Sequence, residues 1–269
     1  MANEESKTYS SEFWCPSVAT DCVIFGFTGK QLKVLLIKRN IEPYKDCWAL
    51  PGGFLRESDK TAEECALREL QEETGLTLSK DRLWQLCISS DIDRDPRTRV
   101  ISLSFIALVT PSDVKGGDDA SEAQWFNINE LPSLAFDHAQ ILEKAKEALK
   151  QKIHFEPIGY DLLGEEFTIP QVQALYESIQ GVTYDRRNFA RKIQTSGFLI
   201  PLDKKASGSA HRPPHLFACN KELFRENARR LKFETKKTAP VFLNGGGGIY
   251  LSFPAAPMRR MPQRKRLSI

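Results

Sequence analysis

The residues best suited to chemistry lie between positions 52 and 76, where carboxylates recur at helical spacing. In a helix over residues 61–74, Glu69, Glu72 and Glu73 stand at i, i+3 and i+4, so they project from one face. Like charges at these spacings destabilise a helix by a few tenths of a kcal/mol per pair. We therefore expect a hard divalent cation, Mg2+ (or Mn2+), to bind these carboxylates beside a substrate phosphate.

Glycines flank the acidic helix. Gly52 and Gly53 follow an apolar, strand-like run at 48–50, and Gly75 stands where a helix ends in the left-handed conformation. The run at 68–76, R-E-L-Q-E-E-T-G-L, resembles the second half of the Nudix box, R-E-U-x-E-E-x-G-U with U aliphatic, at every defined position. In that family the helix binds magnesium and a diphosphate linked to a second moiety, and water attacks phosphorus. The resemblance implies that the catalytic residues are Arg68, Glu69, Glu72 and Glu73.

The first half of the box departs from the family pattern. Gly53 and Arg68 are one residue too far apart, and Asp59 and Lys60 straddle the position of the expected supporting glutamate. An inserted loop residue affects turnover more than metal binding, because errors of about 1 Å can cost a hundredfold in rate.

Basic residues near this segment are candidates for holding an anionic ligand. Three arginines lie in the acidic loop 93–99, where their planar groups suit a phosphate or ribose, and local Arg–Asp salt bridges are the alternative. A basic pair at 38–39 ends a strand, where it either meets the ligand or is only solvated. With the glycine pair, the ligand-binding candidates are Gly52, Gly53, Lys38, Arg39, Arg94, Arg97 and Arg99.

Length and composition indicate a globular chain of two domains. The 269 residues are 41% hydrophobic and 27% charged, and no apolar run approaches the roughly 18 to 20 residues that span a bilayer. The polar, acidic N-terminus is unlike a signal peptide, so we expect a cytoplasmic protein with no membrane partner. Six cysteines lack CxxC pairing and the four histidines are dispersed, which favours reduced core cysteines over a zinc site.

Charge is divided along the chain. Residues 1–150 contain 18 lysines and arginines against 25 acids, a balance of −7, whereas residues 185–269 contain 19 against 5, a balance of +14. A basic final third favours a polyanionic partner, with nucleic acid the leading candidate and a merely solvated tail the alternative.

The pattern of hydrophobic residues predicts the strands and helices of the first domain. Alternation predicts strands at 21–25 and 33–38 joined by a turn at 29–30, and further strands at 100–109 and 124–126. Asp137 can cap a helix whose apolar positions recur at helical spacing up to Leu149. This mixture predicts the αβα sandwich that a Nudix domain would have.

A second module follows the sandwich. Thr168 can cap a helix that ends at Gly181, and Asp185 can cap a basic helix that ends at Gly197. Apolar runs at 198–202 and 215–218 can pair as a hairpin across a basic loop. Helix, turn, basic helix and hairpin predict a winged helix-turn-helix; a small helical subdomain with a solvated charged face is the alternative.

In such a module the second helix reads base edges and other contacts position it on phosphates. Arginine pairs with guanine and asparagine with adenine at about 1–3 kcal/mol of discrimination, whereas Lys192 suits a phosphate and the wing tip suits the backbone or minor groove. The DNA-binding candidates are Arg186, Arg187, Asn188, Arg191, Lys192, His211 and Arg212.

A second resemblance joins the two modules. The segments 51–55, 93–97, 167–170 and 185–192, with Tyr176, resemble the Nudix-related transcriptional regulators of the NrtR type. That resemblance implies homodimers on palindromic double-stranded DNA operators and a Nudix domain that senses a metabolite, commonly ADP-ribose linked to NAD metabolism, with relatives tuned to sugar catabolism. The expected fold is α+β.

We divide the chain into an N-terminal segment at 1–15, a Nudix domain at 16–152, a winged helix-turn-helix at 153–232 and a disordered basic tail at 233–269. Two functions remain open. The favoured one is a DNA-binding regulator whose Nudix domain binds ADP-ribose or a similar molecule as effector. The other is a magnesium-dependent ADP-ribose-type pyrophosphatase with an accessory domain.

Overall fold

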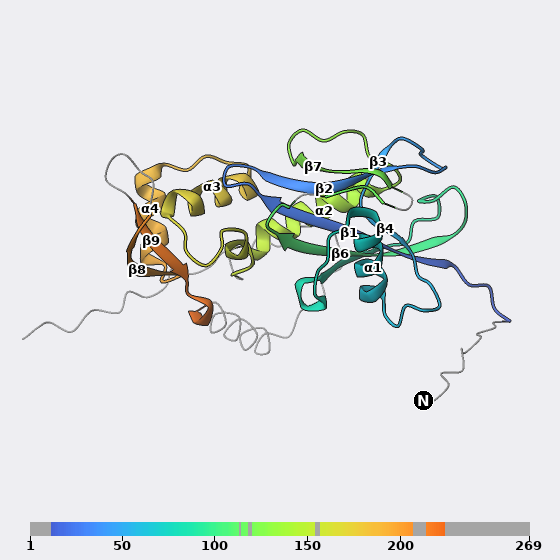
Figure 1. Cartoon of the computed structure of the whole chain (residues 1–269), viewed down its shortest axis with the longest axis horizontal. Helices are drawn as coiled ribbons and strands as arrows, with labels where there is room; N and C mark the ends of the chain where they lie inside the picture. The colour runs from blue at the N-terminus through green and yellow to red at the C-terminus, as the bar shows by residue number, and fades with distance from the viewer. Residues whose placement is uncertain (1–11, 113, 118–119, 154–156, 207–213, 224–269) are drawn as a thin grey trace, which may run out of the picture.

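A computed structural model describes residues 12–112, 114–117, 120–153, 157–206 and 214–223. In these ranges the chain forms a sheet covered by helices and, beside it, a helical unit with a hairpin (Figure 1). The basic tail predicted at 233–269, its disorder included, lies outside the described residues, as do His211 and Arg212.

A seven-stranded mixed sheet forms the first unit. Its strands are β1 (Ser17–Phe27), β2 (Leu32–Arg39), β3 (Trp48–Ala49), β4 (Gly52–Phe54), β5 (Trp84–Ser89), β6 (Val100–Val109) and β7 (Ala120–Asn127). β1 and β6 pair in parallel at the centre, and the other pairs are antiparallel, with β4 joined to β1 and β7 to β2. The four predicted strands are confirmed, and β1, β2 and β7 are longer than predicted.

Helices α1 (Ala62–Thr74) and α2 (His138–Lys152) cover opposite faces of this sheet. Successive side chains of a strand point to opposite faces, so Ile24 packs with Leu70 of α1 while Phe25 packs with Ile141 of α2. The αβα sandwich predicted from the alternation is confirmed. A short 3-10 turn, η1 (Lys80–Arg82), precedes β5.

The second unit is a winged helix-turn-helix, as predicted. It comprises η2 (Pro157–Leu162), α3 (Ile169–Gln180), α4 (Arg186–Thr195), β8 (Leu199–Lys205) and β9 (His215–Cys219). Both helix starts use the predicted caps, since the Asp185 carboxylate accepts from the Asn188 amide at 2.9 Å and the Thr168 amide donates to Gln171 at 2.8 Å. Gly181 ends α3 with φ 70°. β8 and β9 pair antiparallel as the wing.

One hydrophobic cluster runs through both units. It includes Phe25 of β1, Leu149 of α2, Ile179 of α3 and Phe189 of α4. Polar contacts reinforce it, because the Gln180 side chain donates to the Lys150 carbonyl at 3.0 Å and the Ser178 hydroxyl donates to the Lys30 carbonyl at 3.0 Å. The winged helix is therefore packed against the sandwich rather than tethered to it.

Two expectations need correction. Asp137 does stand at the N-cap of α2, but its side chain makes no capping bond, because its carboxylate binds Arg94 instead. All six cysteines are free as expected, yet only Cys22 and Cys65 are buried, and Cys15 is exposed because it precedes the first strand. In the part of the chain that the structure describes, no helix has the length and hydropathy to span a bilayer.

Candidate functional sites

The acidic helix α1 begins one residue later than predicted, because Thr61 is its N-cap, and it ends at Thr74 as predicted. Glu69 and Glu73 face the glycine turn, whereas Glu72 faces the loop at Arg56. The Thr61 hydroxyl accepts from the Glu64 amide at 3.3 Å, and Gly75 ends the helix with φ 72°. Glu69 and Glu73 are buried, 8% and 5% exposed, and burial raises the pKa of Glu69. These two carboxylates therefore lie at the interface between α1 and the sheet.

The glycine pair lets the backbone approach α1 closely. The Gly52 amide donates to Glu73 Oε2 at 2.8 Å. A Cβ on Gly53 would lie 2.6 Å from the Glu69 carboxyl group, which is closer than real contacts allow. A Cβ on Gly52 would clash with the Thr20 carbonyl oxygen, which is backbone and cannot move aside as a side chain can, so this position of the turn needs glycine.

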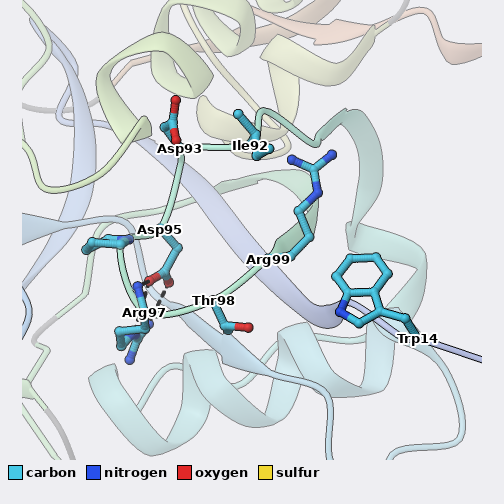
Figure 2. A pocket seen from close by; sticks show the side chains of 8 residues that line it. Trp14, Ile92, Asp93, Asp95, Arg97, Thr98 and Arg99 are labelled. Atoms are coloured by element: carbon cyan, nitrogen blue, oxygen red, sulfur yellow. Dashed lines mark hydrogen bonds and ion pairs between the residues drawn. The ribbon is translucent and has the colours of Figure 1, made fainter.

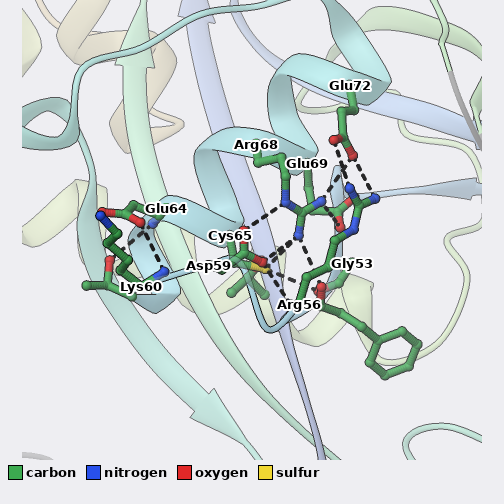
Figure 3. Close-up of polar contacts among 12 residues, drawn as sticks. Gly53, Arg56, Asp59, Lys60, Glu64, Cys65, Arg68, Glu69 and Glu72 are labelled. Carbon is green, nitrogen blue, oxygen red and sulfur yellow. Dashed lines mark hydrogen bonds and ion pairs between the residues drawn. The ribbon is translucent and has the colours of Figure 1, made fainter. Parts of the chain in front are cut away.

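Arg68 points back to the loop that precedes α1 (Figure 3). Its guanidinium binds the Asp59 carboxylate through two bonds, at 2.9 Å and 2.7 Å, and this interaction lowers the pKa of Asp59 to about 2. Asp59 thus supports Arg68 although the loop has an extra residue. The insertion does not deprive the helix of a supporting acid.

The glutamate charges are matched by two arginines. Arg68 Nη1 contacts Glu69 at 2.7 Å and Glu72 at 3.0 Å, and Arg56 binds both oxygens of Glu72, at 3.0 Å and 2.9 Å. Carboxylate oxygens are the ligands that magnesium prefers. Among the described residues, however, no three His, Cys, Asp or Glu side chains are gathered as a metal site would need. The donor types fit a divalent cation, but their present arrangement does not.

The loop arginines have separate roles. Arg94 is buried and binds Asp21 at 3.1 Å and Asp137 at 2.8 Å, so for this residue the salt-bridge alternative holds. Arg97 binds Asp95 at 2.8 Å but keeps 37% of its side chain exposed. Arg99 lines an open hollow of about 640 Å³, which Figure 2 shows, together with Trp14, Ile92, Asp93 and residues 95–98.

A cavity beside the glycine turn gathers cationic and aromatic groups. The Arg39 guanidinium lies 4.9 Å from the Phe136 ring centre, and Arg97 lies 5.2 Å from the Phe54 ring and 5.8 Å from that of Phe136. Gly52 and Gly53 line the same cavity, whereas Lys38 does not. Guanidinium and aromatic groups together suit a phosphate joined to a ring system. The cavity is only about 50 Å³ in volume, so such a ligand would enter only if these side chains moved apart.

Sequence reasoning missed a buried polar network in the wall of this cavity. The Leu50 amide donates to His138 Nδ1 at 2.9 Å, which leaves His138 Nε2 to donate to Asp21, 3.3 Å away. Burial disfavours the Asp21 carboxylate, but its interactions with His138 and Arg94 favour it, and the pKa falls to about 2. The sequence did contain one sign of this network, because Asp21 is an acid within the otherwise apolar run of β1. The network fixes the chain at Leu50, next to the glycine turn.

The basic helix α4 exposes the residues predicted to face DNA. Phe189 and Ile193 are buried against α3, which leaves the other face to solvent. Arg191 donates to the Asn188 side chain at 3.0 Å, so this pair is ordered within the helix. The exposed candidates are Arg186, Arg187, Asn188, Arg191 and Lys192. Their contacts with DNA stay a prediction.

Comparison with known proteins finds a matching family for each of the two units. Residues 16–146 match the NUDIX domain and residues 159–219 match the NrtR DNA-binding winged helix domain. Fold and sites thus define a class of protein in which a Nudix domain is joined to a winged helix DNA-binding domain.

Relatives narrow the class. The "ADPR responsive transcriptional repressor NtrR" of Acinetobacter baylyi is 32% identical over 212 residues, covering 77% of this chain and 83% of that protein. The structure of Shewanella oneidensis NrtR complexed with a 27mer DNA is 29% identical, with a TM-score of 0.62 over 77% of this chain and 95% of that one. The chain belongs to the NrtR family. An ADP-ribose pyrophosphatase of Methanocaldococcus jannaschii is 49% identical over 128 residues, 48% of this chain and 72% of that protein.

Proposed function

We propose that this chain is a DNA-binding transcriptional regulator whose Nudix domain binds ADP-ribose, or a closely related nucleoside diphosphate derivative, as its effector. The observation that carries the proposal is an exposed basic helix, α4, in a winged helix packed on a Nudix domain through a shared core. The response of the Acinetobacter baylyi repressor to ADPR supports the choice of ligand.

The ligand cavity lies between the glycine turn and Phe136. Arg39 and Arg97 would bind the diphosphate, and the Phe54 and Phe136 rings would contact the base or the riboses. Mg2+ (or Mn2+) would bind Glu69, Glu72 and Glu73 after these carboxylates rearrange, and would supply positive charge to the diphosphate.

On the DNA side, α4 would enter the major groove of an operator. Arg186, Arg187 and Asn188 lie in its first turn, where recognition helices contact bases. A homodimer would place two copies of α4 on a palindromic operator, in the cytoplasm.

Selection of bound sequences from random DNA, with and without ADP-ribose, tests this function. The regulator reading requires a preferred sequence, an affinity that falls as salt rises, and a change in affinity when ADP-ribose binds. If no selected sequence binds better than random DNA, the chain is not a sequence-specific regulator.

The second candidate is a magnesium-dependent ADP-ribose pyrophosphatase. The complete motif at 68–76 and the similarity to the Methanocaldococcus jannaschii pyrophosphatase favour it. Purified protein would be incubated with ADP-ribose and magnesium, and products separated by chromatography. Turnover that is lost in Glu72→Gln or Glu73→Gln would establish hydrolysis and exclude a pure sensor.

A further inference from the structure

Arg56 lies in the loop before α1 and pairs with Glu72, one of the glutamates predicted to bind a metal ion. Its two terminal nitrogens bind the two oxygens of Glu72, at 3.0 Å and 2.9 Å, in the fork geometry that makes such pairs strong. The Arg56 amide donates to Asp59 at 2.8 Å, which anchors the backbone while 52% of the side chain stays exposed. The guanidinium is thus held by one carboxylate, that of Glu72, toward which it points in Figure 3.

The two arginines beside α1, Arg68 and Arg56, differ in the number of carboxylates that each contacts. Arg68 contacts Asp59, Glu69 and Glu72, and its side chain is 19% exposed, so it is an integral part of the helix. Arg56 contacts Glu72 alone in the ion pairs that the described residues form. Of the two cations, Arg56 is therefore the one that can leave without dismantling the loop.

We propose that Arg56 is a built-in counter-ion that takes the place of a divalent cation at Glu72. A metal ion must displace its guanidinium, because Arg56 engages both Glu72 oxygens, one of which also accepts from Arg68, and a further cation there would be repelled. In the absence of metal, Arg56 keeps the carboxylates from repelling an anionic ligand, and its planar fork matches a phosphate as well as a carboxylate. The proposal thus has two consequences: a metal ion competes with Arg56, and Arg56 helps an anionic ligand to bind when metal is absent. The second consequence rests on the proposed effector, whereas the first does not.

Binding of Mn2+ alone to the full chain tests the first consequence. Arg56→Gln is expected to bind Mn2+ about fivefold to tenfold more tightly than the unsubstituted protein, as measured from the free Mn2+ signal in electron paramagnetic resonance titrations. Arg56→Lys keeps the charge but loses the fork, so its affinity should fall between the two.

Lys80→Gln is the matched control. Lys80 of η1 lies 3.5 Å from Glu63 at the other end of α1, so its loss removes one positive charge from beside the same helix without freeing Glu72. Its Mn2+ affinity should stay within about twofold of the unsubstituted protein. Equal or weaker Mn2+ binding by Arg56→Gln, with an unchanged circular dichroism spectrum, would overturn the proposal, as would equal gains in both variants.

ADP-ribose binding measured by calorimetry in EDTA tests the second consequence. Arg56→Gln should weaken it about tenfold in EDTA and much less with saturating Mn2+, because the metal then supplies the missing charge. A structural defect would weaken binding equally in both conditions and would count against the proposal. If the unsubstituted protein does not bind ADP-ribose at all, the proposed effector is wrong, while the Mn2+ titration still decides the role of Arg56.

Discussion

At the scale of residues, the glycine turn and the polar groups beside it form the proposed ligand site. The glutamate spacing could be predicted from the sequence, because helical periodicity is local. The partners of these side chains could not, since Asp21, Arg94 and His138 come from three distant segments that only the folded sheet brings together. The partner of Arg56 could not be predicted either, because Arg56 lies in a loop, where neither helical nor strand periodicity applies.

Replacing Gly53 with alanine tests the close approach of the turn. The new Cβ would lie 2.6 Å from the Glu69 carboxyl group, so this end of a flexible side chain must move away from its ion pair with Arg68, at a cost of about 1 kcal/mol in stability and with loss of ADP-ribose binding. Gly29→Ala is the control, because a Cβ there meets no neighbour within 4 Å while φ is 83°, which costs about 1 kcal/mol away from the site. Urea unfolding and calorimetry measure both effects; normal ADP-ribose binding in Gly53→Ala would refute the argument.

Asp21→Asn tests the buried network through its dependence on pH. The pKa of Asp21 is about 2, below the ordinary 3.8 of an aspartate, so its contribution to stability is complete above about pH 4 and is lost as pH falls through 2. We expect the variant to be less stable by about 3 kcal/mol at pH 7 and the difference to shrink toward pH 2. Urea unfolding across this range measures it. A constant difference contradicts the assignment, and Glu143→Gln, on the exposed surface of α2, should show none.

At the scale of elements, α4 was predicted well because its signals are local. The Asp185 cap, the buried Phe189 and Ile193, and Gly197 after the last turn all lie within one short stretch. The wing was also predicted, although the register of β8 with β9 and the Phe167–Phe217 bridge depend on contacts between segments. The tip residues proposed for DNA lie outside the part that the structure describes.

Two substitutions on α4 separate base reading from phosphate binding. Lys192→Gln should weaken binding to all sequences alike and lower the slope of log affinity against log salt by about 1. Asn188→Ala should instead cost about 1–3 kcal/mol on the preferred sequence and little on others. Fluorescence anisotropy at several salt concentrations measures both. If both variants lose affinity uniformly, Asn188 does not read a base.

At the scale of the whole molecule, the shared core makes the two units mechanically dependent. Leu149 at the end of α2 is fully buried, and it lines the same small hollow as Ile179 of α3. The family resemblance predicted both units, but periodicity in α2 could not show that its last turn packs on the winged helix. The boundary proposed between residues 152 and 153 remains a prediction.

Leu149→Ala should therefore destabilise both units together, by about 2–5 kcal/mol, because it leaves a cavity where they meet. All four tryptophans precede residue 126, so their fluorescence reports on the Nudix unit, while far-ultraviolet circular dichroism reports on both. The two signals should change at the same urea concentration in the unsubstituted protein and at the same lower one in the variant. Separate midpoints would mean that the units fold independently. If the two units unfold together, ADP-ribose at about 100 times its Kd should raise the free energy of unfolding of the winged helix as well, by about 2.7 kcal/mol. A DNA-binding domain that a ligand controls requires such a linkage between ligand binding and its own stability.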